Sequence, residues 1–255
     1  IETWAEFFDD STASQILKSH GFADIVTANN VFAHADDLRG FASNVRKLLK
    51  PDGVFVFEVS YAADVYRDVL FDTIYHEHYS YLSLMTVQRI FKKHGLGIYD
   101  VEEIQTHGGS LRIHACHQVK YEERRQPAVA DILAKESEAG LQEMENYSSL
   151  QGRADSIKNS LNRLLIDLKG DEKKLVAYGA AAKGNTLLNY CGIRRDLLSF
   201  IADASPHKQG RYTPGMHIPV VDELSLKSYR PHYILILPWN ISDEIASQLS
   251  YVREW

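Results

Sequence analysis

The sequence of 255 residues is poor in cysteine and contains no long apolar run. Its two cysteines, Cys116 and Cys191, lie far apart, and neither has a second cysteine at the spacing of a zinc or redox motif. The sequence therefore predicts neither a disulfide framework nor a cysteine-based metal site, which fits a reducing cytoplasm. No apolar run approaches the roughly 18 residues of a membrane-spanning helix, and the N-terminus lacks the basic and apolar regions of a signal peptide. We expect neither a membrane partner nor export.

Strong positive charge is also missing. The formal net charge is -6 and the pI is about 6.0, and no basic run could neutralise a phosphate backbone. This argues against nucleic-acid binding and favours small molecules as partners. With 45% hydrophobic and 24% charged residues, the composition is that of an ordinary globular protein with one large or two modest domains. The chain opens at Ile1 rather than Met and continues into Trp4, Phe7 and Phe8, so we expect it to be cut from something longer.

The first half of the chain alternates helical and strand patterns, as in an α/β fold. We expect helices over 11–20 (with Ser11 or Thr12 as N-cap), 36–49 and 85–94. Strands are expected over 24–28 and 54–59, with a turn at 51–53 between the helix 36–49 and the strand 54–59. A pair of antiparallel strands is expected over 97–104 and 110–117. Functional groups of such folds gather beyond the carboxyl ends of the strands. Asn29, Asn30 and His34 follow the first expected strand and are therefore candidates for a site.

Tyr75-His76-Glu77-His78 is the densest group of functional side chains. Burial alone explains it poorly, because each buried polar tip would need its own partner. Histidine can exchange a proton near neutral pH, a carboxylate can orient an imidazole, and a tyrosine can hold a developing oxyanion. The stretch therefore predicts general acid/base chemistry. Two other interpretations stay open: a metal site, although the spacing supplies only two ligands, and a polar loop that contains one hydrogen-bonded core histidine.

Residues 128–168 are polar and helix-forming, and we expect one or two long helices broken near Gly152. An α/β pattern then restarts, with strands over 174–178, 197–202 and 233–237, a helix starting over 186–190 and a further helix from 242. The small-residue turn at 179–185 would aim backbone N–H groups at an anion, but Ala181 stands where a dinucleotide motif has its second glycine. Asp203 has the position of a ribose-binding acid or of an acid that caps a loop, and the sequence does not decide between these roles.

Four motifs, in this order, resemble the sugar C-methyltransferases, and the resemblance runs from about Phe8 to the end. They are Phe71-Asp72-x-x-Tyr75-His76-Glu77-His78, His107-Gly108-Gly109-Ser110-Leu111-Arg112, Tyr178-Gly179-Ala180-Ala181-Ala182-Lys183-Gly184-Asn185-Thr186, and Lys208-Gln209-Gly210-Arg211-Tyr212-Thr213-Pro214-Gly215-x-His217-Ile218-Pro219. Members of this family use S-adenosylmethionine to methylate C3 of nucleotide-linked 4-keto-deoxyhexoses.

The resemblance implies a partial domain organisation. The zinc-binding module and the glycine-rich cofactor loop that begin these enzymes have no counterpart here, so zinc is expected only in that N-terminal module. We expect the C-terminal half of a class I methyltransferase domain over 1–122, a helical connector over 123–170 and a Rossmann-like nucleotide-sugar domain over 171–255. The polypeptide alone is then expected to be inactive as a methyltransferase.

The resemblance also implies roles for individual residues. His78 would be the base that removes the C3 proton, flanked by Glu77 and Tyr75, and His34 would be a second active-site histidine. The remaining assignments are cofactor contact for Asn29 and Asn30, and contact with the diphosphate and base of the substrate, expected to be a thymidine diphosphate sugar, for Lys183, Asn185, Arg211 and Tyr212. Two alternatives remain: an NAD-dependent nucleotide-sugar oxidoreductase, and a non-catalytic nucleotide-sugar binding module.

Overall fold

A computed structural model describes residues 2–255, which divide into two compact units. The first unit contains the chain up to Asp68 together with His76–Ser148, and the second contains Val69–Tyr75 and Ser149–Trp255. The helices expected as a connector are shared between the units, since α6 (Pro127–Glu138) and α7 (Met144–Tyr147) belong to the first and α8 (Leu150–Gly170) to the second. The helical region is interrupted at 139–143 and again at 148–149, so a break does lie close to Gly152, although Gly152 itself is helical, in the first turn of α8. Among residues 2–255, no helix is both long and apolar enough to cross a membrane.

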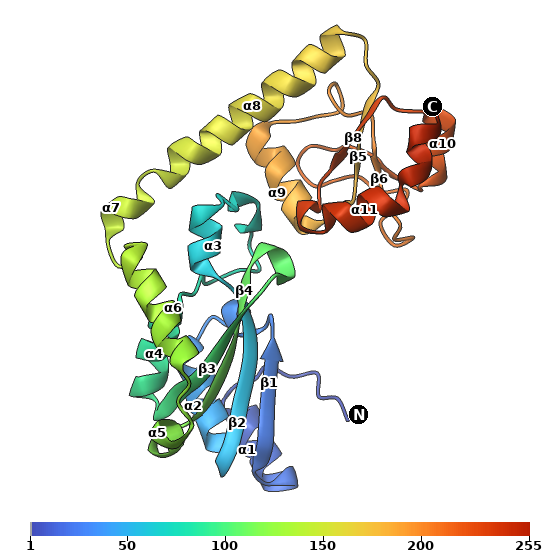
Figure 1. Cartoon of the computed structure of the whole chain (residues 1–255). Helices are drawn as coiled ribbons and strands as arrows, with labels where there is room; N and C mark the ends of the chain where they lie inside the picture. The colour runs from blue at the N-terminus through green and yellow to red at the C-terminus, as the bar shows by residue number, and fades with distance from the viewer. Residues whose placement is uncertain (1) are drawn as a thin grey trace. The chain divides into compact units, whose positions relative to one another are not determined.

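The first unit is built on a mixed sheet in the order β1-β2-β4-β3 (Figure 1). Its strands are β1 (Ala23–Asn29), β2 (Leu49–Ser60), β3 (Leu96–Ile104) and β4 (Ser110–His117). β1 and β2 are parallel, whereas β4 runs antiparallel to both β2 and β3, which confirms the predicted antiparallel pair. The turn predicted over 51–53 lies inside β2, because Ala23 pairs with Leu49 and Ile25 already pairs with Val54. The intervening residues bulge out of the ladder.

Three helices of the first unit begin at a side-chain N-cap: α1 (Asp10–His20), α2 (Leu38–Leu48) and α4 (Leu84–Lys93). Besides α6 and α7, the other elements of this unit are α3 (Ala62–Arg67), α5 (Tyr121–Arg124), η1 (Phe32–His34), η3 (Thr106–Gly108) and η4 (Gln118–Lys120). Asp9, Asp37 and Ser83 each accept a backbone N–H of the helix that follows. The predicted caps Ser11 and Thr12 are wrong, since α1 begins before them and Asp9 takes that role. In the hydrophobic core of this unit, the ring centroid of Phe32 lies 5.1 Å from that of Phe57, and further phenylalanines pack around them.

The second unit is a parallel sheet in the order β7-β6-β5-β8 (Figure 1), as in a Rossmann-like fold. Its elements are η2 (Phe71–Thr73), α8, β5 (Leu175–Tyr178), α9 (Ala182–Cys191), β6 (Ile201–Ala202), β7 (Val220–Val221), α10 (Leu224–Tyr229), β8 (Tyr233–Ile236), η5 (Trp239–Ile241), α11 (Ser242–Gln248) and η6 (Ser250–Glu254). Helix α9 begins four residues before its predicted start at Thr186, and β6 is much shorter than the predicted 197–202.

Two glycines around α9 are needed for close packing inside the protein. A Cβ on Gly184 would lie 2.6 Å from the Cβ of Leu237, and a Cβ on Gly179 would lie 2.5 Å from Pro238 Cδ. Gly179 also has a φ of 86°, which favours glycine. The close approach of α9 to the end of β8 therefore explains Gly184 without a ligand, as for the third glycine of a dinucleotide motif.

Replacing Gly184 by alanine is expected to destabilise the second unit by about 1–3 kcal/mol, because the new methyl group overpacks a buried contact. The same change at Gly152 should stabilise it by about 0.5–1 kcal/mol, since nothing lies within 4 Å of the added Cβ and α8 is helical there. Urea unfolding of both variants measures the difference. Equal midpoints for the two variants would contradict the packing argument.

Candidate active site

The structure brings two of the predicted histidines together. The imidazoles of His34 and His78 lie 5.0 Å apart between ring centroids, with their planes inclined by 32°. His34 ends η1, just beyond the carboxyl end of β1, and His78 belongs to the loop 76–83, which we call the histidine loop. Tyr81 presents its ring edge-on to His78 at 6.2 Å. Two half-buried imidazoles at one site provide both a proton acceptor and a proton donor.

Backbone hydrogen bonds hold the histidine loop against the sheet edge. Ser80 N–H donates to Ala33 O at 3.2 Å, one residue before His34, and Ala62 N–H donates to Leu82 O at 3.1 Å. His76 and Glu77 are exposed, whereas His78 is half-buried. Of the two histidines of the loop, His78 is therefore the better candidate for the active site. Tyr75 is half-buried and belongs to the second unit.

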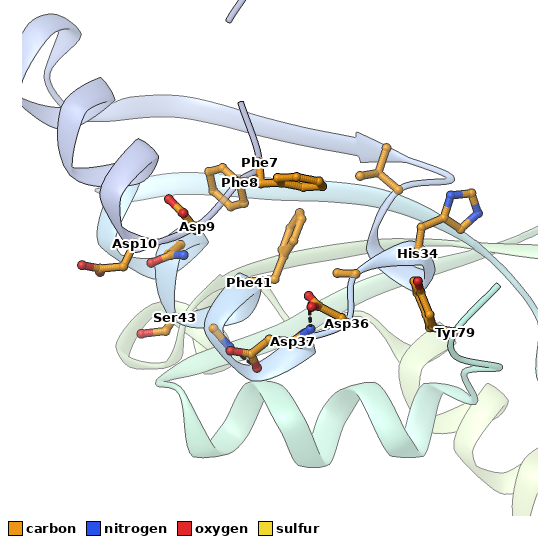
Figure 2. A pocket seen from close by; sticks show the side chains of 14 residues that line it. Phe7, Phe8, Asp9, Asp10, His34, Asp36, Asp37, Phe41, Ser43 and Tyr79 are labelled. Carbon is orange, nitrogen blue, oxygen red and sulfur yellow. Dashed lines mark hydrogen bonds between the residues drawn. The ribbon is translucent and has the colours of Figure 1, made fainter. Parts of the chain in front are cut away.

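A pocket of about 770 Å³ opens beside His34 in the first unit. Figure 2 shows Phe7, Phe8 and Phe41 between the carboxylates of Asp9 and Asp10 on one side and His34 and Tyr79 on the other. Asp36 and Asp37 complete an acidic lining. Apolar rings with several carboxylates suit a ligand that carries both an aromatic group and positive charge.

Most of these carboxylates also have structural roles. Asp9 and Asp37 are the N-caps of α1 and α2, and Asp10 forms an ion pair with Lys47 at 3.0 Å. The backbone N–H of Thr12 lowers the pKa of Asp9. Asp36 accepts only a local bond, from Asp37 N–H at 2.8 Å. Its exposed carboxylate is therefore the one best suited to a cationic ligand.

The predicted cofactor residues Asn29 and Asn30 lie at the carboxyl end of β1 but do not line this pocket. Asn30 has a φ of 53° and donates its backbone N–H to Glu58 O at 2.9 Å. Asparagine tolerates this left-handed conformation better than most residues. Asn30 thus turns the chain from β1 toward η1 and His34.

No group of three His, Cys, Asp or Glu side chains within residues 2–255 is arranged to hold a metal ion.

The predicted substrate residues of the second unit fall into two groups. Lys183 and Asn185 are both near the start of α9, but residues two apart on a helix point about 200° away from one another. Asn185 faces Asn189, whose amide donates to Asn185 O at 2.8 Å and to Pro214 O at 3.1 Å. That second bond ties α9 to the loop 211–219, where Arg211 and Tyr212 are exposed. Asn189 thus links the helix that carries Asn185 to the loop that carries Arg211 and Tyr212.

Lys183 lies in a different environment. Its ammonium is 4.9 Å from the ring centroid of Trp239 and donates to Asn240 Oδ1 at 3.2 Å. Trp239 Nε1 donates to Asp72 Oδ2 at 2.6 Å. Burial lowers the pKa of Lys183 while the charge of Asp72 acts against that shift, and burial raises the pKa of Asp72 while Trp239 and Lys183 oppose it.

The carboxylate of Asp203 accepts three hydrogen bonds from neighbouring residues. Ala180 N–H donates at 2.7 Å, Ser205 N–H at 2.8 Å and Lys208 Nζ at 3.2 Å. This arrangement is that of an acid that caps a loop, one of the two roles that the sequence left open. It gives the dinucleotide alternative no support.

Sequence reasoning did not single out Asp36, Asp37, Tyr79 or Phe8 as lining a pocket, nor the pairing of Asp72 with Trp239. The adjacent carboxylates of Asp36 and Asp37, separated from His34 only by Ala35, were a usable signal for the pocket. No local signal pairs Asp72 with Trp239, because they are 167 positions apart.

Family comparisons match both halves of the chain. Residues 4–101 match the family model described as "Methyltransferase domain", and residues 105–255 match the one described as "C-methyltransferase C-terminal domain". A curated relative, C-methyltransferase NovU from Streptomyces niveus, is 35% identical over 245 residues. The matched region is 96% of this chain but 58% of that relative, so the chain spans little more than half of the relative's length.

Solved structures resemble only part of the chain. An O-methyltransferase family protein from Burkholderia thailandensis is 19% identical with a TM-score of 0.34, and the match covers 46% of this chain and 36% of that one. Magnesium protoporphyrin IX methyltransferase from Synechocystis PCC 6803, solved with S-adenosylhomocysteine, is 12% identical with a TM-score of 0.30, covering 42% of this chain and 57% of that one.

Proposed function

This chain belongs to the C-methyltransferase family, and we propose that it carries the proton-abstracting site and the nucleotide-sugar domain of an enzyme that methylates C3 of a nucleotide-linked 4-keto-deoxyhexose. The observation that supports this most directly is the pairing of His34 with His78 at the carboxyl edge of β1. The 35% identity to a C-methyltransferase supports the reaction type.

The chemistry begins with a proton next to a ketone. His78, as a neutral imidazole, accepts the C3 proton, the C–H bond breaks, and its electron pair moves to the C4 carbonyl to form an enolate. An enolate oxygen needs a donor to be stable, and His34 or the hydroxyl of Tyr75 supplies it. Glu77, exposed beside His78, orients or stabilises the imidazolium that forms.

S-adenosylmethionine, when bound, supplies an electrophilic methyl group for the carbon nucleophile. The aromatic and acidic lining beside His34 fits its adenine and its positive charges. Phe8, Phe41 and Asp36 would hold it there. Asn29 and Asn30, which do not line this pocket, would contact only a part of the cofactor that extends to the end of β1.

Proton abstraction can be tested without the methyl donor. The protein is incubated in deuterium oxide with a thymidine diphosphate 4-keto-deoxyhexose, and deuterium at C3 is followed by NMR. Incorporation at C3 above the rate without protein supports the proposal. A C3 rate equal to the background, with the nucleotide sugar bound, contradicts it.

For the nucleotide, we expect Arg211→Gln to weaken binding of thymidine diphosphate about 10- to 100-fold, because a charge-assisted hydrogen bond contributes about 1.5–3 kcal/mol. Arg195→Gln is the control, since Arg195 is equally exposed in the same unit. Calorimetric titration measures both. Equal affinities for the two variants would remove Arg211 from the binding site.

A further inference from the structure

Tyr61 lies directly after β2, at the same edge of the sheet as His34, because the parallel strands β1 and β2 end at that edge. Only 3% of Tyr61 is exposed. Its backbone reaches the histidine loop, since Tyr61 forms a parallel bridge with Leu82, and Ala62 N–H donates to Leu82 O at 3.1 Å. The main chain of Tyr61 is therefore in direct contact with the loop that carries His78.

The side chain of Tyr61 contacts a second element. Its hydroxyl donates to the carboxylate of Glu136, which is completely buried in α6. The same carboxylate accepts Leu84 N–H at 2.6 Å and Met85 N–H at 2.9 Å. These N–H groups belong to the first turn of α4 and have no acceptor within the helix. Since α6 packs against α4 (Figure 1), Glu136 joins the hydroxyl of Tyr61 to the residues that follow the histidine loop.

The hydroxyl of Tyr61 remains a hydrogen-bond donor at neutral pH. Burial and the negative charge of Glu136 raise the pKa of Tyr61, so the hydroxyl keeps its proton. Burying a carboxylate is costly unless hydrogen bonds compensate its charge, and removing one donor leaves part of that cost uncompensated. The bond between Tyr61 and Glu136 therefore stabilises the position of α4 relative to the end of β2.

The start of the segment 80–85 lies close to the two histidines. Ser80 N–H donates to the carbonyl oxygen of the residue before His34, at 3.2 Å. Ser80 is also only two positions from His78, whose ring centroid lies 5.0 Å from that of His34. Movement of residues 80–85 would therefore change how the two imidazoles face one another.

We propose that Tyr61 is a positioning residue that fixes residues 80–85 through its hydroxyl and its backbone, and so holds His78 beside His34 for proton abstraction. All these residues belong to the first unit. A loop that is fixed before the substrate binds has less conformational freedom to lose, which preorganises its catalytic group. The effect on His78 rests on the proposed function, whereas the fixing of residues 80–85 does not.

The test uses Tyr61→Phe, which removes the hydroxyl but keeps the buried ring. Amide hydrogen exchange of the whole chain is followed residue by residue by NMR. We expect the amides of Ser80, Leu84 and Met85 to exchange about 10- to 100-fold faster than in the wild type. In the control Tyr147→Phe, the lost hydroxyl bond of 2.8 Å belongs to the same unit but involves neither the histidine loop nor α4, so these three amides should keep their rates. Unchanged exchange in Tyr61→Phe, or acceleration that does not extend to Ser80, would overturn the proposal.

A second readout separates positioning from substrate binding. In Tyr61→Phe we expect the C3 deuterium incorporation rate at saturating nucleotide sugar to fall about tenfold, with the affinity for thymidine diphosphate within about twofold of wild type. Tyr147→Phe should change neither quantity. A loss of affinity with an unchanged saturated rate would overturn the positioning role. If the wild-type protein shows no C3 incorporation with the nucleotide sugar bound, the proposed function fails, and the exchange of Ser80 still decides whether Tyr61 fixes the loop.

Discussion

His78→Gln is expected to lower C3 deuterium incorporation about 10²- to 10⁴-fold, which is the usual contribution of a positioned general base. Glutamine has a similar size and can keep a hydrogen bond, but it cannot accept a proton at neutral pH. Because the measurement follows proton exchange alone, the result does not depend on the methyl donor. It is therefore the most direct test of the histidine pair.

Two further variants serve as comparisons for His78→Gln. His76→Gln changes an exposed histidine in the same loop and should leave the incorporation rate within about twofold, since its side chain points to solvent. His34→Leu should have an intermediate effect if His34 supports the enolate, because leucine has no donor and a lost donor in such a site costs about 2.7–4 kcal/mol. If His78→Gln matched His76→Gln, the base would have to be another group.

The strands of the first unit could be predicted because their signals are local. Phe55, Phe57 and Val59 form the buried face of β2, and the alternation around Ile113 marks β4 with one face in the core. The N-cap of α1 was harder to predict from the sequence, since Asp9, Asp10, Ser11 and Thr12 are all plausible caps. The break near Gly152 lies just before α8, and Gly152 itself stays helical because one glycine costs a helix only about 1 kcal/mol.

The site was predictable where its residues share a motif and not where long-range packing joins them. His78 stands in a visible cluster, and His34 follows a strand end. Lys183 was predicted from its loop, but its partners Asp72 and Trp239 come from opposite ends of the sequence. Their pairing depends on how the segment 69–75 crosses into the second unit, which no local pattern encodes.

Glu136 is a buried carboxylate that joins α6 to the start of α4. It is completely buried in α6, and its two oxygens accept Leu84 N–H at 2.6 Å and Met85 N–H at 2.9 Å. The hydroxyl of Tyr61 also donates to it. Burial raises the pKa of Glu136, and these three hydrogen bonds act in the opposite direction. Since Leu84 and Met85 begin α4 directly after the histidine loop, Glu136 holds the far end of that loop as well.

Glu136→Ala is accordingly expected to lower the free energy of unfolding of the first unit by about 3–5 kcal/mol, because it leaves two backbone donors and a tyrosine hydroxyl without their acceptor and opens a cavity. Glu138→Ala is the matched control: the same substitution at an exposed position of the same helix should change that free energy by less than about 0.5 kcal/mol. Urea unfolding followed through the amide protection of β2 and β4 reports on this unit separately from the second. Equal urea midpoints for the two variants would contradict this prediction. The hydrogen bonds of Glu136 to the start of α4 would then contribute nothing measurable to the stability of the first unit.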